Sequence, residues 1–413
     1  MSVLRRRDFA LAWTGGLVSM VGNWALRIAL PIHVYEQTGS TLATSGVVAA
    51  GVVPAILLGT VAGVFVDRWN RKTTLVVANV LLALATLPLV AVGDSSTIWL
   101  VYPVVLGSST LALFTMPAEN AFLPRLVEED QLLAANSLNA LNDSLARLIG
   151  PAAGGALVAL TGLAGVVVFD VASFLVAAAL IAAVRTSGEI TEAGEATTAA
   201  MRRWRRMWHE WREGIALVGR ERPVRVIFVV AAITAVGEGV FAVMFVVWVR
   251  EILEGGALEL GWLQTSQAVG GLIGGAVGGW VGARLAPARL FAAGLIAFGI
   301  FDLALFNYPL LFSGVWLGLG LMVLVGAPGV WILAAARTIL QMHVVDAYRG
   351  RIFAALGTTA GLLMLVGTVA AGVAGGFLGP IVLLNIQGGA YVAAGLFVLT
   401  TLSAKRAAAP ILR

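Results

Sequence analysis

Residues 37–66 read QTGSTLATSGVVAAGVVPAILLGTVAGVFV and contain no Asp, Glu, Lys or Arg. A bilayer core is spanned by about 20 apolar residues of helix, so this stretch is long enough to cross it. Further uncharged runs occupy residues 73–93, 95–118, 148–169, 260–283, 303–336 and 352–404. We therefore predict an all-helical polytopic membrane protein and exclude a water-soluble enzyme.

The composition agrees with this prediction and excludes several kinds of site. Charged residues make up 12% of the 413 residues, whereas soluble domains contain about 25%. The chain has no cysteine and three dispersed histidines, which excludes disulfides, thiolate zinc sites and iron–sulfur clusters. Neither lysine follows a glycine, so a Walker A loop for ATP is also excluded. We expect no catalytic residues, no metal and no cofactor.

The basic residues indicate the topology. Reading the uncharged runs as helices gives about twelve spans, because residues 352–404 suffice for two, divided near Gly379-Pro380. All basic residues except Arg27, Arg147 and Arg250 then fall in one set of alternating loops. The positive-inside rule places this set and both termini in the cytoplasm. This one-sided distribution argues against a nucleic-acid partner. The excess of arginine over lysine suggests a GC-rich bacterium, so we expect the bacterial inner membrane.

The longest polar segment, residues 185–222, divides the chain. It separates an N-terminal six-helix bundle, residues 1–184, from a C-terminal six-helix bundle, residues 223–413. Within this linker, tryptophans recur at helical spacing opposite arginines, which predicts a basic amphipathic helix in the headgroup region. The helix either tethers the bundles or senses lipid.

The two bundles resemble each other in sequence. Gly63-x-x-x-Asp67-Arg68 corresponds to Gly279-x-x-x-Ala283-Arg284, 216 positions later. Leu123-Pro124-x-x-Val127 corresponds to Leu340-Gln341-x-x-Val344, 217 positions later. Parallel repeats with a site between them are a transporter architecture.

Two motifs carry a family resemblance. Gly63-x-x-x-Asp67-Arg68-x-x-Arg71-Lys72 resembles the loop signature of the major facilitator superfamily. Gly150-Pro151-x-x-Gly154-Gly155 is similar to the antiporter motif of that superfamily. Further stretches, among them Phe114-x-x-Pro117-Ala118 and Asp170-x-x-Ser173-Phe174, look like the drug, macrolide and siderophore exporter branch.

This resemblance implies a fold and roles for both motifs. Two pseudo-symmetric six-helix bundles would alternate access to a cavity lined mainly by spans one, four, seven and ten. Asp67 would approach Arg351 at the start of span eleven, and a cytoplasmic gate would comprise Gly63, Asp67, Arg68, Arg71, Lys72 and Arg351. A solvated charge run with a topological role is the alternative. The span-five residues Gly150, Pro151, Gly154 and Gly155 form either a bending point or a close-packing face.

Charges inside the membrane are costly, by about 2.5–3.5 kcal/mol at mid-bilayer, and are functional candidates. Glu238 lies near the centre of span seven and is our candidate proton-coupling acid. Arg27, in span one, either pairs with Glu238 or attracts an anionic substrate group. Asn23 stands where many relatives carry an acid.

Other polar and aromatic groups have structural explanations as well. Asp143 and Arg147 are four residues apart and could meet on one helix face, either as a structural or gating pair or as part of a proton-coupling site. Asp170 and Asp302 are interpreted as polar anchors near the outer ends of peripheral spans. Trp331 could offer an aromatic surface to a substrate or anchor the helix at the lipid interface.

These observations favour a secondary transporter that exports small amphipathic or lipophilic compounds, in multidrug fashion, by proton antiport. We expect a monomer whose partners are a small-molecule substrate, protons and membrane lipids. A dedicated siderophore or lysolipid carrier of the same fold is the alternative transport hypothesis. A non-transporting membrane sensor or scaffold is the alternative from another class, and the charges at Arg27 and Glu238 argue against it.

Overall fold

The computed structural model describes residues 3–66, 69–188, 218–219 and 221–402, and every regular element within them is helical. The long helices are α1 (Arg7–Thr38), α2 (Thr41–Val66), α3 (Arg71–Thr86), α6 (Leu132–Ala182), α8 (Arg222–Glu251), α9 (Ala257–Gly282), α10 (Pro287–Asn307), α11 (Val315–His343) and α12 (Asp346–Leu402). Two shorter helices are α4 (Val101–Ala112) and α5 (Thr115–Phe122). Single 3-10 turns occupy Val3–Arg5, Leu87–Ala91, Ile98–Leu100, Leu123–Arg125, Glu129–Gln131 and Tyr308–Leu310.

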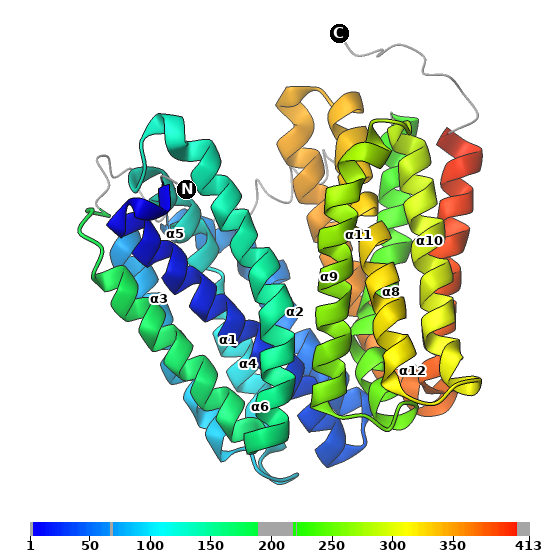
Figure 1. Ribbon diagram of the computed structural model, residues 1–413, viewed down its shortest axis with the longest axis horizontal. Coiled ribbons are helices and arrows are strands. Elements are labelled where there is room, and N and C mark those ends of the chain that lie inside the picture. The colour runs from blue at the N-terminus through cyan, green and yellow to red at the C-terminus, as the bar shows by residue number, and fades with distance from the viewer. Residues whose placement is uncertain (1–2, 67–68, 189–217, 220, 403–413) are drawn as a thin grey trace. The chain divides into compact units, whose positions relative to one another are not determined.

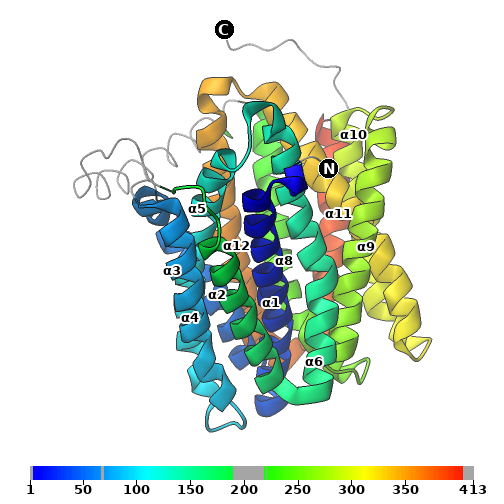
Figure 2. The same cartoon turned by 60° about the vertical axis from the view of Figure 1, so that its left-hand side comes forward.

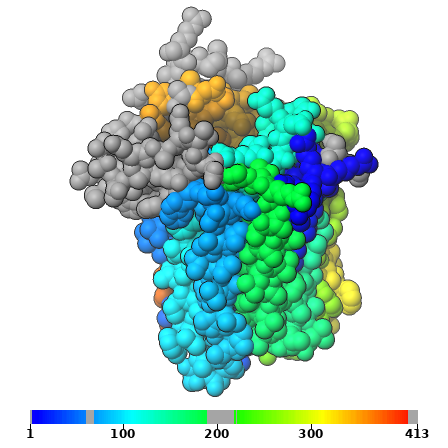
Figure 3. Space-filling model, turned by 90° about the vertical axis from the view of Figure 1, so that its left-hand side faces the viewer, coloured from blue at the N-terminus to red at the C-terminus, as the bar shows by residue number. Residues whose placement is uncertain are grey.

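Nine helical stretches of the described residues are long and apolar enough to cross a membrane. α6 and α12 each count once in this number, and the glycine-rich α9 is not among the nine. In Figure 3, α3, α4 and the second half of α6 form one continuous face of the N-terminal part. These helices expose apolar side chains, as expected for contact with lipid, including Val77, Leu81, Leu84, Leu106, Val168 and Leu175.

Two glycines interrupt the longest helices. Gly162 in α6 has φ 69° and ψ −171°, and Gly379 in α12 has φ 71° and ψ 168°. Residues with a Cβ rarely adopt this positive φ, so glycine is the residue that permits the chain to reverse there. The break at Gly379 lies where the sequence predicted a division between two spans, whereas the sequence gave no specific signal for Gly162.

The contacts divide the chain into two units. Unit 1 comprises residues 1–39, 46–205 and 256–265, and unit 2 comprises residues 40–45, 206–255 and 266–413. Within unit 1, α1 runs alongside α6, as both Figure 1 and Figure 2 show. Within unit 2, α8 packs extensively on α12. Most of the predicted linker, including its tryptophan-rich segment, lies outside the described residues.

Both units use glycine at their main helix crossing. A Cβ on Gly150 of α6 would lie 2.4 Å from the Cβ of Trp24 in α1. A Cβ on Gly367 of α12 would lie 2.1 Å from the carbonyl oxygen of Val236 in α8. Gly367 follows Gly150 by 217 positions, the offset of one predicted loop match. The backbones therefore approach closely at equivalent places in the two units, which supports an internal repeat.

Candidate functional site

Unit 1 contains a cavity of about 340 Å³ between α1, α3, α5 and α6. The α1 residues that line it recur three, four or seven positions apart, because such residues share one helix face. The predicted site residues Asn23, Arg27, Asp143 and Arg147 all line this cavity. Much of the remaining wall is apolar and comes from Phe9, Trp13, Met20, Trp24, Leu82, Met116, Phe122 and Phe174.

Two arginines meet at one end of the cavity. The guanidinium carbon of Arg27 lies 4.7 Å from the ring centroid of Trp24, and that of Arg147 lies 5.2 Å from the same ring. Both arginine side chains are exposed to the open space of the cavity. The position of Trp24 is fixed by close packing of its Cβ against Gly150. The indole ring of Trp24 thus contacts two guanidinium groups, one from α1 and one from α6.

Two carboxylates lie toward the other end. Glu119 of α5 is half-buried, and its Oε1 lies 3.2 Å from where a Cβ on Gly16 would stand. Asp143 of α6 is exposed and close enough for its charge to act on Glu119. Eight residues separate Gly16 from Trp24, so the carboxylate and guanidinium ends are about 12 Å apart along α1. The cavity is therefore strongly polarised.

Sequence reasoning missed Glu119. The sequence gave only a weak indication of this residue. Glu119 is the first charged residue after the uncharged run 95–118 and lies one turn into a short helix. Its partner across the cavity, Gly16, leaves the room that the carboxylate occupies. Only the packing of α5 on α1 brings these positions together.

The predicted pairing of Asp143 with Arg147 is not formed. No ion pair joins these two residues in the described part of the chain, although they are one helical turn apart. The guanidinium group of Arg147 instead lies over the ring of Trp24. The attraction between a guanidinium ion and an aromatic face is worth about 0.5–2 kcal/mol. An exposed ion pair between residues i and i+4 of a helix is worth about 0.2–0.5 kcal/mol, so the contact of Arg147 with Trp24 can replace the ion pair with Asp143.

Polar contacts hold α1 and α6 together beside this cavity. The Trp13 indole Nε1 donates to the carbonyl of Leu138 at 2.8 Å. In the opposite direction, the Asn142 amide donates to the carbonyl of Trp13 at 3.1 Å. These reciprocal bonds fix the register of the two helices, and so the height of Arg27 on α1 relative to Asp143 and Arg147 on α6.

Unit 2 contains a separate cluster of polar groups around Glu238. The Tyr391 hydroxyl donates to Glu238 Oε1 at 2.6 Å, and the Gln387 amide donates to Asp302 Oδ2 at 2.9 Å. Gln387 and Tyr391 are one turn apart on α12, and both approach Gly237. Glu238 itself has an exposed side chain, whereas Asp302, Gln387 and Tyr391 are buried. The cluster therefore contains one accessible and one buried carboxyl group.

Asp170 and Asp302, interpreted from the sequence as polar anchors near outer span ends, are buried between helices. Each is 1% exposed, and Asp302 lies with Gln387 in the interior of unit 2. The Oδ1 atom of each has no hydrogen-bond partner among the described residues. Both aspartates therefore lie in helix–helix contacts. Hydrophobic periodicity does not predict this, because it assigns polar residues to the exposed face of a helix.

The polar positions of the two units correspond. Glu238, Asp302 and Gln387 follow Gly22, Thr86 and Asp170 by 216, 216 and 217 positions. Thr86 and Asp170 are buried in unit 1, and a Cβ on Gly22 would lie 2.7 Å from Asp170 Oδ1. Unit 2 thus carries an acid, Glu238, at the position where unit 1 has glycine.

The sequence matches the transmembrane secretion effector family over residues 1–409. The chain belongs to this family. As a member of the major facilitator superfamily, and of its drug-exporter branch, the protein is a transporter rather than an enzyme.

Curated relatives match over most of the chain. The secretion effector is 25% identical to macrolide efflux protein A of Streptococcus pyogenes over 363 residues, 87% of each chain. It is 27% identical to the multidrug efflux pump Tap of Mycobacterium tuberculosis over 305 residues, which cover 71% of this chain and 70% of Tap.

Solved structures show the same fold. A bacterial homologue of the iron transporter ferroportin, crystallised in an inward-facing state, superposes with a TM-score of 0.75 at 18% identity, covering 97% of this chain and 99% of the homologue. A variant of the peptide transporter POT gives a TM-score of 0.77 at 12% identity, covering 96% and 94% of the two chains. At these identities the likeness concerns the fold alone.

The predicted gate motif of the secretion effector is only partly visible. Asp67 and Arg68 lie outside the described residues, and Gly63 lies in α2. Arg351 stacks on Tyr348, with 5.5 Å between its guanidinium carbon and the ring centroid. Its role in a gate stays a prediction.

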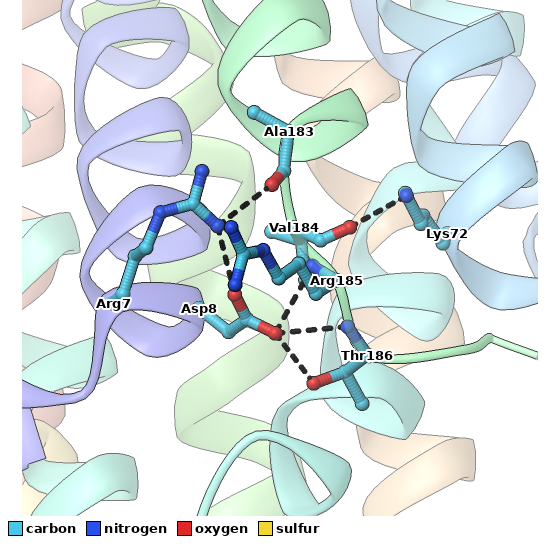
Figure 4. A network of polar contacts seen from close by, with 7 residues as sticks. All are labelled: Arg7, Asp8, Lys72, Ala183, Val184, Arg185 and Thr186. Carbon is cyan, nitrogen blue, oxygen red and sulfur yellow. Dashed lines mark hydrogen bonds and ion pairs between the residues drawn. The ribbon is translucent and has the colours of Figure 1, made fainter.

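The remaining motif cations bind carbonyl groups at two helix ends, Lys72 at the end of α6, as Figure 4 shows, and Arg71 at the end of α5. Lys72 Nζ donates to the carbonyl of Val184 at 2.6 Å, and Arg71 donates to the carbonyl of Ala121 at 3.1 Å. Asp8 of α1 accepts hydrogen bonds from Arg185 N, Thr186 N and Thr186 Oγ1 at 3.0, 2.8 and 2.7 Å. A helix ends with unpaired carbonyls and a negative dipole end, so cations are favoured there. These contacts fix the chain as it leaves unit 1.

The span-five motif is a close-packing face of the secretion effector. A Cβ on Gly154 would lie 2.6 Å from Ala25 Cα, and one on Gly155 would lie 2.4 Å from the carbonyl oxygen of Ala257. The carbonyl of Pro151 is approached in turn by Gly261 of α9. α6 therefore contacts both α1 and the start of α9 through this motif. Bending at the motif stays a prediction.

Trp331 is engaged in helix packing in unit 2. Its indole Nε1 donates to the carbonyl of Gly274 at 2.8 Å, and its ring fills the space beside Gly278. Trp331 does not line the cavity of unit 1. An aromatic contact with substrate is instead available at Trp24.

Proposed function

We propose that this secretion effector exports small amphipathic or lipophilic compounds across the bacterial inner membrane by proton antiport. The observation that carries the proposal is the charged, partly apolar cavity of unit 1. Its volume of about 340 Å³ lies in the range of small-molecule sites, roughly 300–1,000 Å³. The efflux proteins among the relatives support export as the direction of transport.

The proposed architecture has twelve spans with both termini in the cytoplasm. Nine candidate spans of the described residues include α6 and α12 once each. The reversals at Gly162 and Gly379 divide each of these helices into two arms, and α9 has the length of a span. The proposed domains are the bundles of residues 1–184 and 223–413, joined by the linker 185–222.

Proton coupling is assigned to carboxyl groups in both units. Glu238 is accessible and hydrogen-bonded to Tyr391, so it can exchange a proton without unfolding its surroundings. Glu119 and Asp143 both line the cavity of unit 1, where a proton carried by either carboxyl group would be close to a bound substrate. No nucleotide motif is present, so an ion gradient is the energy source that these groups can use.

Transport in proteoliposomes tests the proposal. The purified full-length chain is reconstituted, and movement of a macrolide and of the fluorescent cation dansylcadaverine is followed under an imposed pH gradient. We expect uphill movement of at least one compound that stops when a protonophore collapses the gradient. Movement that persists after collapse would refute proton coupling. Absence of protein-dependent movement of either compound would refute multidrug efflux.

A further inference from the structure

The guanidinium pair of the cavity lacks acidic partners. Neither Arg27 nor Arg147 forms an ion pair with any described residue. Their guanidinium carbons are at most about 10 Å apart, because both lie over the ring of Trp24, and they repel each other. Uncompensated charges at membrane depth are expensive and mark functional sites.

The nearest acids of the cavity do not neutralise the pair. Asp143 is one turn, about 6 Å, from Arg147 along α6, yet the two residues form no ion pair in the described part of the chain. Glu119 lies beside Gly16, at the far end of the cavity from Trp24. A compensating negative charge must therefore come from a group that enters the cavity.

The chemistry of this end suits an oxyanion. Arginine presents planar N–H donors that match carboxylate, sulfonate and phosphate oxygens, often two at a time. Both guanidinium groups lie over the ring of Trp24, within reach of the same part of the cavity. Beyond it, Met20, Met116 and Phe174 provide adaptable apolar walls for a hydrophobic body.

We propose that Arg27, Arg147 and Trp24 form an anion subsite that binds the carboxylate, sulfonate or phosphate head group of an amphipathic organic anion. This inference rests on the proposed transport function and names a substrate class for it. An anionic lipid head group has the same chemistry, so the test includes lipid as a competing source of the anion.

Binding of three matched fluorescent probes tests the subsite. Dansyl-leucine carries a carboxylate, its methyl ester removes that charge, and dansylcadaverine is cationic. The full-length protein is reconstituted in phosphatidylcholine vesicles, with and without added phosphatidylglycerol. We expect dansyl-leucine to bind at least tenfold more tightly than its ester. Arg27→Gln and Arg147→Gln should each weaken dansyl-leucine binding about tenfold or more and leave dansylcadaverine binding unchanged.

Two further variants separate charge from fold. Arg27→Lys keeps the positive charge without the planar donor fork and should recover only part of the affinity. Arg289→Gln removes an exposed arginine outside the cavity and should change nothing. Equal loss of all three probes in Arg27→Gln would indicate a structural role and overturn the proposal. Unchanged dansyl-leucine binding in both glutamine variants, or no binding by wild type, would overturn it as well.

The lipid arm and the transport assay complete the test. If phosphatidylglycerol abolishes dansyl-leucine binding in wild type but not in Arg27→Gln, the occupant is lipid and the substrate assignment is overturned; retained binding supports it. Failure of proton-driven movement of both the macrolide and dansylcadaverine would refute the proposed efflux mechanism. The anion subsite would still be tested independently, by the effect of Arg27→Gln and Arg147→Gln on dansyl-leucine binding.

Discussion

At the residue scale, unit 2 contains a buried polar pair with unused acceptors. Gln387 Nε2 donates to Asp302 Oδ2, but Asp302 Oδ1 and Gln387 Oε1 have no partner among the described residues. A buried acceptor without a donor costs about 1–3 kcal/mol. Two such unpaired acceptors lie on neighbouring side chains here. The Asp302–Gln387 pair is therefore not optimised for stability.

This arrangement predicts a stabilising substitution. In Asp302→Asn, an amide replaces one carboxyl oxygen and can donate to Gln387 Oε1, so the unfolding free energy should rise by about 1–3 kcal/mol. Thermal unfolding of the purified protein in detergent measures the change. Asp302→Leu should lower stability because it removes the acceptor of Gln387. Asp130→Asn, in the exposed turn before α6, is the control and should leave the unfolding temperature unchanged. A less stable Asp302→Asn protein would contradict the prediction.

At the element scale, the sequence predicted what depends on local pattern. Uncharged runs located the helices, and Gly379-Pro380 marked the break in α12, because a helix cannot continue through a positive φ and a proline. It did not predict that Arg147 would turn from Asp143 to Trp24, or that Glu119 would lie beside Gly16. These two contacts depend on which helices pack against each other. The hydrophobic periodicity of one sequence shows which face of a helix is buried, but it does not show which helix covers that face.

Matched glycines in two helices test the role of close packing. Alanine at position 154 of α6 would place its Cβ 2.6 Å from Ala25 Cα, whereas nothing lies within 4 Å of a Cβ at position 107 of α4. Overpacking costs about 1–3 kcal/mol, but alanine is favoured over glycine in an open helix by about 1 kcal/mol. Gly154→Ala should therefore lower the thermal unfolding temperature, and Gly107→Ala should raise it or leave it unchanged. Equal effects of the two substitutions would contradict a packing role for Gly154.

At the scale of the whole molecule, a repeated framework carries different chemistry in its two units. The crossing glycines Gly150 and Gly367 correspond, as do the polar positions of Asp170 and Gln387. The guanidinium pair belongs to unit 1, however, and the accessible acid Glu238 belongs to unit 2. The contribution of Glu238 to proton coupling should therefore be separable by mutation from substrate recognition in unit 1.

Counterflow and gradient-driven transport distinguish these two roles. Glu238→Gln cannot release a proton, so proton-driven movement of dansylcadaverine should fall at least tenfold. Exchange of labelled for unlabelled compound without a gradient should persist, because it needs only binding and the conformational change. Glu129→Gln, an exposed acid in the turn before α6, is the matched control and should retain both activities. Loss of exchange together with driven transport in Glu238→Gln would place this residue in binding or folding. Full driven transport in that variant would leave Glu119 and Asp143 as the acids that couple transport to protons.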